Sequence, residues 1–381
     1  MKKFIVLILL FCLTLSLFVV NNINFNDEKI YAENFCKASV VIERDSKRVL
    51  YEHNKDDRLA MASTTKIMTA LVTLDNCNDI HEKVKVDDRA IGIEGTSIYL
   101  RKGEELTVEE LLYGLILPSG NDASLALAFH IGKGNLQYFV NLMNEKAESL
   151  NLKNTHFENP HGLDADGHYT SAYDLAVITS EALKNDTFRE IVKTPVKQIS
   201  GNSEVPHRFL RNKQRLLKTL EGCGGVKSGF TDNAGRCLVT SCCRDGMELI
   251  SVVLNCPNMF DESARIINDA FIEYNYETLL SPYNYITNIK VDDGVMENVK
   301  VYSMKGFKFP LKDDEKTKIK IETEIEDVLS APVEKEKIVG NIKVYFDEEL
   351  VFSENIYTME AVESKDIKDK VKDIIDKWFY E

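Results

Sequence analysis

The chain has 381 residues, which is enough for two domains or for one large domain with an appended segment. A hydrophobic fraction of 44% and a charged fraction of 28%, with only 8 prolines and 19 glycines, exclude a disordered or collagen-like chain. The 47 basic residues against 61 acidic ones give a net charge of −14, which repels a phosphate backbone. We therefore expect no nucleic acid partner.

The N-terminus carries the pattern of an export signal. Met1, Lys2 and Lys3 precede an almost uninterrupted apolar run over residues 4–20. The small residue at Ala32 predicts cleavage there, so residues 1–32 are expected to be a signal peptide. An uncut membrane anchor and a buried helix are the alternatives. With either a signal or an anchor, the protein works outside the cytoplasm, at the outer face of the membrane or in the wall.

The cysteines do not form a metal-binding or redox pattern. Removal of Cys12 with the signal leaves seven, an odd number that cannot be fully paired, and no CxxC spacing occurs. We expect mostly free, buried thiols, with one or two disulfides as the alternative. The seven are Cys36, Cys77, Cys223, Cys237, Cys242, Cys243 and Cys256.

Residues 33–276 combine strands at both ends with helices in between. Period-two apolar segments around polar turns predict hairpins, and longer periodic segments predict helices. The strands are expected at 40–43, 49–52, 236–242 and 247–254, and the helices at 65–74, 108–116 and 123–130. The order indicates an α+β fold in which the first and last hairpins share one antiparallel sheet.

The composition changes near Pro282. Short strand-like segments separated by charged turns predict a small all-β domain over residues 283–360, without a catalytic cluster and therefore with a positional role. These segments are 286–291, 299–302, 318–322, 342–346 and 350–352.

An amphipathic helix is predicted over residues 361–381. Its apolar stripe consists of Ile367, Val371, Ile374, Ile375, Trp378 and Phe379. The stripe could lie in a membrane interface, or it could dock on the protein's own domain or on a partner. The opposite face of the helix carries charges of both signs, so it offers no attraction to anionic lipid.

Three short motifs point to serine chemistry. Ser63 and Lys66 are three residues apart on a predicted helix, so the amine can reach the hydroxyl and act as its base. A helix N-cap is the alternative role for Ser63. Ser119-Gly120-Asn121 follows the second predicted helix and can transfer protons and hold a substrate amide, although it also fits an ordinary loop.

The third motif, Lys227-Ser228-Gly229, precedes the last hairpin. Its cation and hydroxyl suit a substrate carboxylate, and Gly229 allows a substrate backbone to run close beside the strand. A glycine-rich turn is the simpler alternative. Lys213 and Arg215 are further basic candidates for contacting the substrate.

Together and in this order, the motifs resemble those of low-molecular-weight penicillin-binding proteins, the serine-type D-alanyl-D-alanine carboxypeptidases. The chain departs by lacking a proline in the first segment and by carrying Ser228 where threonine is commoner. The resemblance implies a β-lactamase/transpeptidase-like domain, with an antiparallel sheet flanked by helices and a helical subdomain, followed by a β-rich domain and a membrane anchor. The similar segments are 59–70, 161–169 and 225–231.

The resemblance also implies roles. Ser63 is acylated by a peptidoglycan stem pentapeptide, which releases terminal D-alanine, or by a β-lactam; Lys66 is the base. Ser119 and Asn121 relay protons and position the substrate amide, and Lys227 and Ser228 bind the carboxylate. The backbone N–H groups of Ser63 and Phe230 form the oxyanion hole.

Three alternatives remain at this stage. A metallopeptidase would use His161, Asp164 and His168, whereas the resemblance implies no cofactor and a loop that only braces the active-site wall. A β-lactamase would need a deacylating glutamate, and no ExxLN-type segment matches. A non-catalytic wall-binding protein would retain the fold but bind stem peptides without releasing D-alanine.

Overall fold

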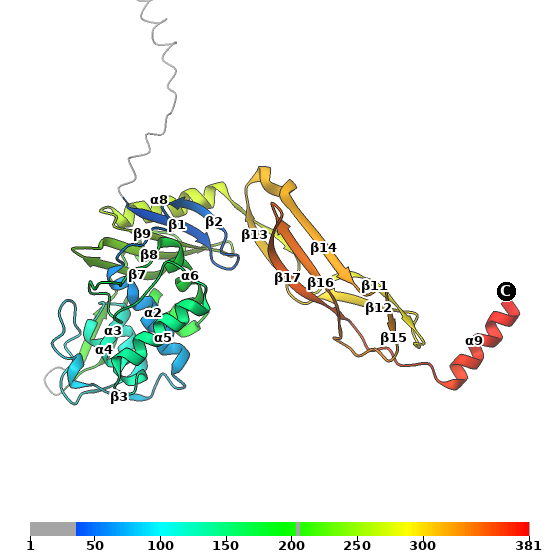
Figure 1. Cartoon of the computed structure of the whole chain (residues 1–381), viewed down its shortest axis with the longest axis horizontal. Helices are drawn as coiled ribbons and strands as arrows, with labels where there is room; N and C mark the ends of the chain where they lie inside the picture. The colour runs from blue at the N-terminus through cyan, green and yellow to red at the C-terminus, as the bar shows by residue number, and fades with distance from the viewer. Residues whose placement is uncertain (1–35, 203–205, 381) are drawn as a thin grey trace, which may run out of the picture. The chain divides into compact units, whose positions relative to one another are not determined.

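The computed structural model describes residues 36–202 and 206–380 (Figure 1). The predicted export signal, residues 1–32, lies outside this part. None of the helices in the described ranges combines the length and apolar composition needed to cross a bilayer.

A five-stranded antiparallel sheet forms the centre of the first part of the chain, in the order β2-β1-β9-β8-β7. β1 pairs with β9, with Ala38 opposite Leu254, so the predicted sharing of one sheet by the two ends of the region is confirmed. β7 is an edge strand, which leaves one side of its backbone unpaired within the sheet. The bounds are β1 Ala38–Glu43, β2 Val49–His53, β7 Cys223–Thr231, β8 Gly235–Arg244 and β9 Met247–Leu254.

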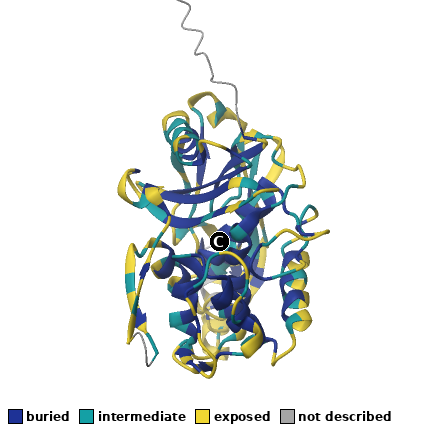
Figure 2. Ribbon diagram, turned by 90° about the vertical axis from the view of Figure 1, so that its left-hand side faces the viewer, coloured by how far each residue is buried: buried dark blue, intermediate teal, exposed yellow. Residues whose placement is uncertain are grey.

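Both faces of this sheet are covered. Val252 of β9 packs into the core beneath α2 and α6, whereas its neighbour Val253 faces the core under α8 (Figure 1). All residues of β9 are buried, which explains its continuous apolar run, and Figure 2 shows the buried sheet between the helical layers. The helices are η1 Ala62–Thr65, α2 Lys66–Asn76, α3 Val108–Ile116, α4 Asn121–Ile131, α5 Leu136–Ser149, α6 Ala172–Ala182, α7 Asp186–Lys193 and α8 Met259–Glu273.

The predicted hairpins and the helices around the motifs are confirmed, but α5, α6, α7 and α8 were not predicted. Small hairpins also extend the helical layer at its edges. These are β3 Lys83–Lys85 with β4 Glu105–Thr107, and β5 Val196–Ser200 with β6 His207–Arg211.

The C-terminal part is all-β, as predicted, and ends in α9 Ile367–Tyr380. Its six-stranded sheet has the order β14-β16-β17-β12-β11-β15 around a core of aliphatic side chains. β10 pairs with β13, and these two strands and β15 were not predicted. The bounds are β10 Asn275–Leu280, β11 Asn284–Asp292, β12 Asn298–Ser303, β13 Phe307–Leu311, β14 Ile319–Ile325, β15 Val328–Ser330, β16 Ile338–Phe346 and β17 Glu349–Thr358.

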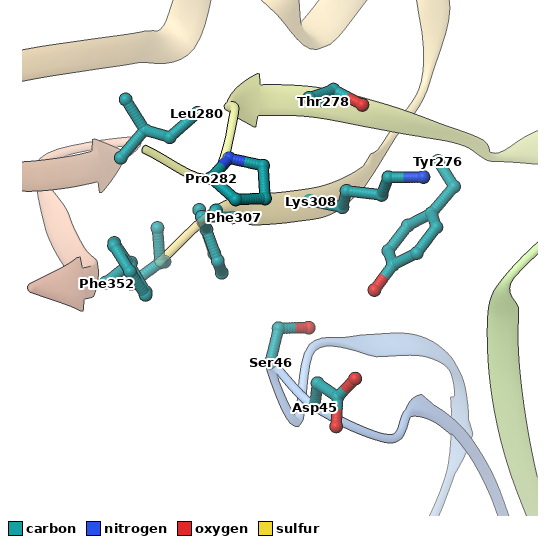
Figure 3. A pocket seen from close by; sticks show the side chains of 11 residues that line it. Asp45, Ser46, Tyr276, Thr278, Leu280, Pro282, Phe307, Lys308 and Phe352 are labelled. Atoms are coloured by element: carbon teal, nitrogen blue, oxygen red, sulfur yellow. The ribbon is translucent and has the colours of Figure 1, made fainter. Parts of the chain in front are cut away.

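Arg48 of the first hairpin contacts the C-terminal part. Its guanidinium donates to both carboxylate oxygens of Glu315, at 2.7 and 2.8 Å, and lies 4.2 Å from the ring centre of Phe346. A neighbouring pocket of about 520 Å³ lies between the turn at Asp45 and the strands β10, β13 and β17 (Figure 3). No motif residue lines this pocket, so it is separate from the predicted chemistry.

The cysteines follow the expectation only in part. Cys36 and Cys256 form a disulfide that joins the start of β1 to the end of β9. Five cysteines in the described residues are free, but only Cys237 and Cys242 of these are buried. Free thiols therefore predominate, while the alternative of a bridge holds for one pair.

Candidate active site

The first motif occupies the turn that leads into α2. Thr64 Oγ1 donates to the carbonyl of Met61 at 2.6 Å and Thr65 Oγ1 to that of Ala62 at 2.9 Å, so the threonines hold the turn by satisfying carbonyls ahead of the helix. Ser63 makes no capping hydrogen bond, which rules out the N-cap alternative. Its Oγ lies 3.0 Å from Lys66 Nζ, the contact that the three-residue spacing predicts.

Lys66 is fully buried and surrounded by acceptors. Its Nζ donates to Asn121 Oδ1 at 2.7 Å and to the carbonyl of His161 at 2.5 Å. Burial lowers the pKa of Lys66 well below its usual range, and the charges of Lys227 and Lys213 lower it further. A neutral amine has two N–H groups and one lone pair. With Asn121 and His161 accepting the two N–H groups, the lone pair is directed at the Ser63 hydroxyl, so Lys66 can act as its base.

The second motif lies between α3 and α4. Ser119 has φ +73° and a buried Oγ without a hydrogen-bond partner among the described residues. Asn121 begins α4, and its Nδ2 donates to the carbonyl of Glu94 at 2.6 Å. This bond fixes the amide so that Oδ1 faces Lys66.

Asp122 is a site-building residue that the sequence did not reveal. Its carboxylate accepts hydrogen bonds from the backbone N–H groups of Ile98 and Leu100, both at 3.0 Å, and from Ser97 Oγ at 2.5 Å. These bonds hold the loop whose Thr96 carbonyl accepts from Asn121 N at 2.7 Å. An acid directly after the motif, at a helix N-terminus, was the available signal.

The third motif lies on the edge strand β7, against the first motif. A Cβ added at Gly229 would lie 2.8 Å from Ser63 N and 3.1 Å from Thr64 N, so only glycine permits this approach. Lys227 is 2% exposed and donates to the carbonyl of Ser228 at 2.7 Å. Burial, with a smaller contribution from Lys213, lowers the pKa of Lys227 to about 7. Phe230 follows on the strand with its ring 60% exposed.

Lys213 joins the site and Arg215 does not. Lys213 Nζ donates to Thr96 Oγ1 at 3.3 Å, and burial lowers its pKa. Its charge acts on both Lys66 and Lys227, so three lysines form one cluster that favours a carboxylate. The guanidinium of Arg215 lies 5.1 Å from the ring centre of Phe260 on α8, on the other face of the sheet, so the candidate role of Arg215 at the site is wrong.

The residues of the metal alternative have other partners. Glu158 N donates to His168 Nδ1 at 3.0 Å, which leaves the proton on Nε2 for Thr65 Oγ1 at 2.8 Å. Asp164 Oδ1 accepts from Thr231 Oγ1 at 2.9 Å. Burial lowers the pKa of His161 to about 3 and that of His168 to about 4, so both are neutral. Within residues 36–202 and 206–380, no cluster of three His, Cys, Asp or Glu side chains is placed to hold a metal ion.

This segment instead braces the wall of the site. The carbonyl of Pro160 accepts from Thr69 Oγ1 and Ser124 Oγ, both at 2.6 Å, which ties the segment to α2 and α4. The next carbonyl, that of His161, accepts from Lys66. The sequence led us to expect a brace here, but it did not identify a backbone carbonyl as a hydrogen-bond partner of the Lys66 amine.

A buried lysine with a lowered pKa against a serine hydroxyl, beside an edge strand and two further lysines, is the arrangement expected of a serine acyl-transfer enzyme of the Ser–Lys type. A family model of D-alanyl-D-alanine carboxypeptidases matches residues 26–258, and one of the penicillin-binding protein 5 C-terminal domain matches residues 274–364. The chain belongs to the D-alanyl-D-alanine carboxypeptidase family.

Individual relatives are similar to this protein along most of its chain. D-alanyl-D-alanine carboxypeptidase DacF of Bacillus subtilis is 35% identical over 323 residues, which cover 83% of this chain and 82% of DacF. DacC of Escherichia coli is 30% identical, with 89% of this chain and 87% of DacC covered. The structure of penicillin binding protein 5 from Haemophilus influenzae matches with a TM-score of 0.71 at 28% identity and covers 87% of this chain and 98% of that one.

Gly229→Ala tests the close approach of β7 to the serine turn. The added methyl group meets backbone nitrogens that cannot move independently, so we expect acylation by a labelled penicillin to slow by about 10²-fold, comparable to the loss of one oxyanion donor. Gly224→Ala on the same strand is the matched control, because its Cβ meets only the Ser241 hydroxyl at 2.9 Å. Equal acylation rates for the two variants would contradict the assigned geometry.

Proposed function

We propose that the chain is an exported serine D,D-carboxypeptidase that removes the terminal D-alanine from peptidoglycan stem pentapeptides and is acylated by β-lactams. The observation that carries this function is the 3.0 Å contact between Ser63 Oγ and a fully buried Lys66 amine. We assign the chemistry to residues 33–276 and the positioning of the enzyme to residues 283–360 and 361–381.

Acylation begins with transfer of the Ser63 proton to Lys66 Nζ as the oxygen attacks the penultimate D-alanine carbonyl. The substrate backbone lies along β7, whose outer edge is unpaired in the sheet and whose Gly229 has no side chain in the way. The backbone N–H groups of Ser63 and Phe230 stabilise the oxyanion. Collapse of the tetrahedral intermediate then breaks the amide bond.

The leaving amine needs a proton, and the acyl-enzyme needs a water. Lys66 gained a proton during attack, and Ser119 Oγ, which has no other partner in the described structure, relays it to the departing D-alanine. Asn121 holds Lys66 and the substrate amide through its fixed side chain. Water then attacks the acyl carbonyl with Lys66 again as the base, which restores Ser63.

The terminal carboxylate binds at the cationic end of the site. Lys227 and Ser228 contact it directly, and Lys213 adds a second positive charge beside Thr96. The same groups accept the carboxylate of a penicillin. Local steering of this kind overcomes the unfavourable net charge of −14 for an anionic substrate.

The C-terminal helix α9 is proposed to hold the enzyme at the membrane surface. Five side chains of its apolar stripe are exposed, which argues against docking of this face on the protein's own domain. They are Ile367, Val371, Ile374, Ile375 and Trp378, with Trp378 86% exposed. A helix with one apolar face and a terminal tryptophan suits the interface of a bilayer rather than its interior.

Ser63→Ala tests the nucleophile. We expect labelled penicillin to form one covalent adduct on the wild type, mapped to Ser63, and none on the variant; Ser149→Ala, on an exposed position, is the control. The wild type is also expected to release D-alanine from a pentapeptide. Sustained nitrocefin hydrolysis would instead indicate a β-lactamase, and pentapeptide binding without D-alanine release would indicate a non-catalytic binding protein.

Lys213→Ala tests the electrostatic coupling of the three lysines. Acylation needs Lys66 neutral and Lys227 protonated, so the rate rises with pH through the lowered pKa of Lys66 and falls above about pH 7. Removal of the Lys213 charge raises the pKa of both lysines. We therefore expect both limbs of the pH profile of penicillin acylation to move to higher pH. An unchanged profile, like that expected for the exposed control Lys218→Ala, would contradict the coupling.

The proposed membrane role of α9 can be tested by tryptophan fluorescence, because Trp378 is the single tryptophan of the chain. We expect its fluorescence to shift to shorter wavelength with neutral phosphatidylcholine vesicles, since the mixed polar face does not require anionic lipid. Ile374→Asp on the apolar stripe should abolish the shift, and Lys372→Ala on the polar face should retain it. No shift for the wild type at any vesicle concentration would refute the proposal.

A further inference from the structure

Three tyrosines and an isoleucine form a line across the outer face of the C-terminal sheet. β11, β12, β17 and β16 are neighbouring strands (Figure 1). Tyr285 is opposite Tyr302, Tyr302 is opposite Tyr357, and Tyr357 is opposite Ile338. Directly opposed residues share one face, and neighbouring strands are about 4.8 Å apart, so the line spans about 14 Å.

This face is turned away from the domain core. Val301 and Ile356, which adjoin Tyr302 and Tyr357 in the sequence, are buried in the core of the β domain, so the tyrosines point the other way. Tyr285 is 55% exposed, and Ile338 is 54% exposed. Tyr302, in the middle of the line, is buried at 8% exposed, and Tyr357 is half-buried, so the line is open to solvent at Tyr285 and Ile338.

A fourth tyrosine completes the surface. The ring of Tyr283 stacks on that of Tyr302 with centroids 6.2 Å apart and an interplanar angle of 25°, and Tyr302 lies 6.4 Å from Tyr357. Tyr283 is 74% exposed and has φ +54°, a backbone conformation that tyrosine rarely adopts. We call Tyr283, Tyr285, Tyr302 and Tyr357 the tyrosine row.

Amide side chains lie beside the tyrosine row. Asn355 is opposite Asn341, two residues before Tyr357 on the same strand and therefore on the same face. Asn341 Nδ2 donates to Glu324 Oε2 at 3.4 Å, whereas Asn355 is exposed. The face thus combines aromatic surface with an exposed amide side chain, so a ligand with an apolar face and hydrogen-bonding groups at its rim would suit it.

We propose that the tyrosine row binds the sugar rings of peptidoglycan glycan strands. A pyranose ring presents C–H groups on its faces, which pack on an aromatic ring, while its hydroxyl and acetamido groups can bond with tyrosine hydroxyls and asparagine amides. A surface that is exposed at Tyr283, Tyr285 and Ile338, on a sheet face and not in a closed pocket, accommodates an extended polymer. The inference rests on the proposed function, which acts on peptides attached to that polymer.

Charge favours a neutral ligand here. The chain carries −14, and Glu336 adds a negative charge close enough to influence the Tyr302 hydroxyl. Both features oppose an anionic polymer or an anionic lipid surface. The sugar backbone of the glycan is uncharged, unlike its stem peptides.

Binding of the full chain to two probes tests the assignment. We expect the wild type to sediment with insoluble peptidoglycan and to bind soluble β-1,4-linked N-acetylglucosamine oligomers, which carry no peptide. The double variant Tyr285→Ala/Tyr357→Ala should bind both the peptidoglycan and the oligomers about tenfold more weakly, because two ring contacts are lost. Tyr285→Phe/Tyr357→Phe should retain most of the binding, and Tyr138→Ala, a 46% exposed tyrosine on α5, should retain all of it.

Penicillin acylation separates this inference from the proposed function. The double alanine variant should melt like the wild type and acylate at the same rate. Two results would show that the tyrosine row is not a glycan site while leaving the proposed carboxypeptidase function intact. Either the wild type is acylated but binds neither probe, or the double alanine variant binds both probes as well as the wild type does. Binding to intact peptidoglycan without binding to the oligomer would also overturn the glycan assignment, because it would point to the peptide or to a trapped protein.

Discussion

The structure depends on removing Lys66 from water while leaving its amine within reach of Ser63. A lysine in solution is protonated at neutral pH and cannot act as a base, so the protein must make the charged form unfavourable. Complete burial does this, and the nearby charges of Lys227 and Lys213 add to the effect. The cost of burying a polar group is offset because each N–H of the neutral amine has an acceptor, Asn121 Oδ1 or the His161 carbonyl.

Closure around that amine requires backbone segments to approach more closely than side chains allow. Gly229 brings β7 against the serine turn, and Gly162, at φ +87°, lies where a Cβ would be 1.9 Å from the Ala62 carbonyl. Asp122 supports the remaining side by anchoring the loop that carries Thr96. Three segments that are far apart in the sequence therefore meet at the site: the edge strand β7, the turn before α2 and the bracing segment around Gly162. They can meet because the two glycines leave room for contact between the backbones.

The sequence indicated the residues of the proposed chemistry more clearly than the residues that position them. Ser63, Lys66, Asn121 and Lys227 are recognisable because their side chains, taken together at this spacing, suit nucleophilic catalysis and little else. The acceptor role of His161 is invisible in sequence, since any residue supplies a carbonyl. α6 was missed because it is largely buried and lacks a clear polar face, and β10, β13 and β15 depend on long-range pairing that local patterns do not encode.

The two parts of the chain solve different physical problems. The first uses burial to lower the pKa of a few side chains, above all Lys66 and Lys227. The C-terminal part leaves the α9 stripe and three residues of its sheet, Tyr283, Tyr285 and Ile338, exposed to solvent. Exposed apolar surface is unfavourable for an isolated domain, so its retention on two separate elements is more consistent with contact to insoluble surroundings than with a purely structural role. The proposed substrate is a peptide attached to an insoluble polymer, and contacts of this kind keep an enzyme beside such a substrate.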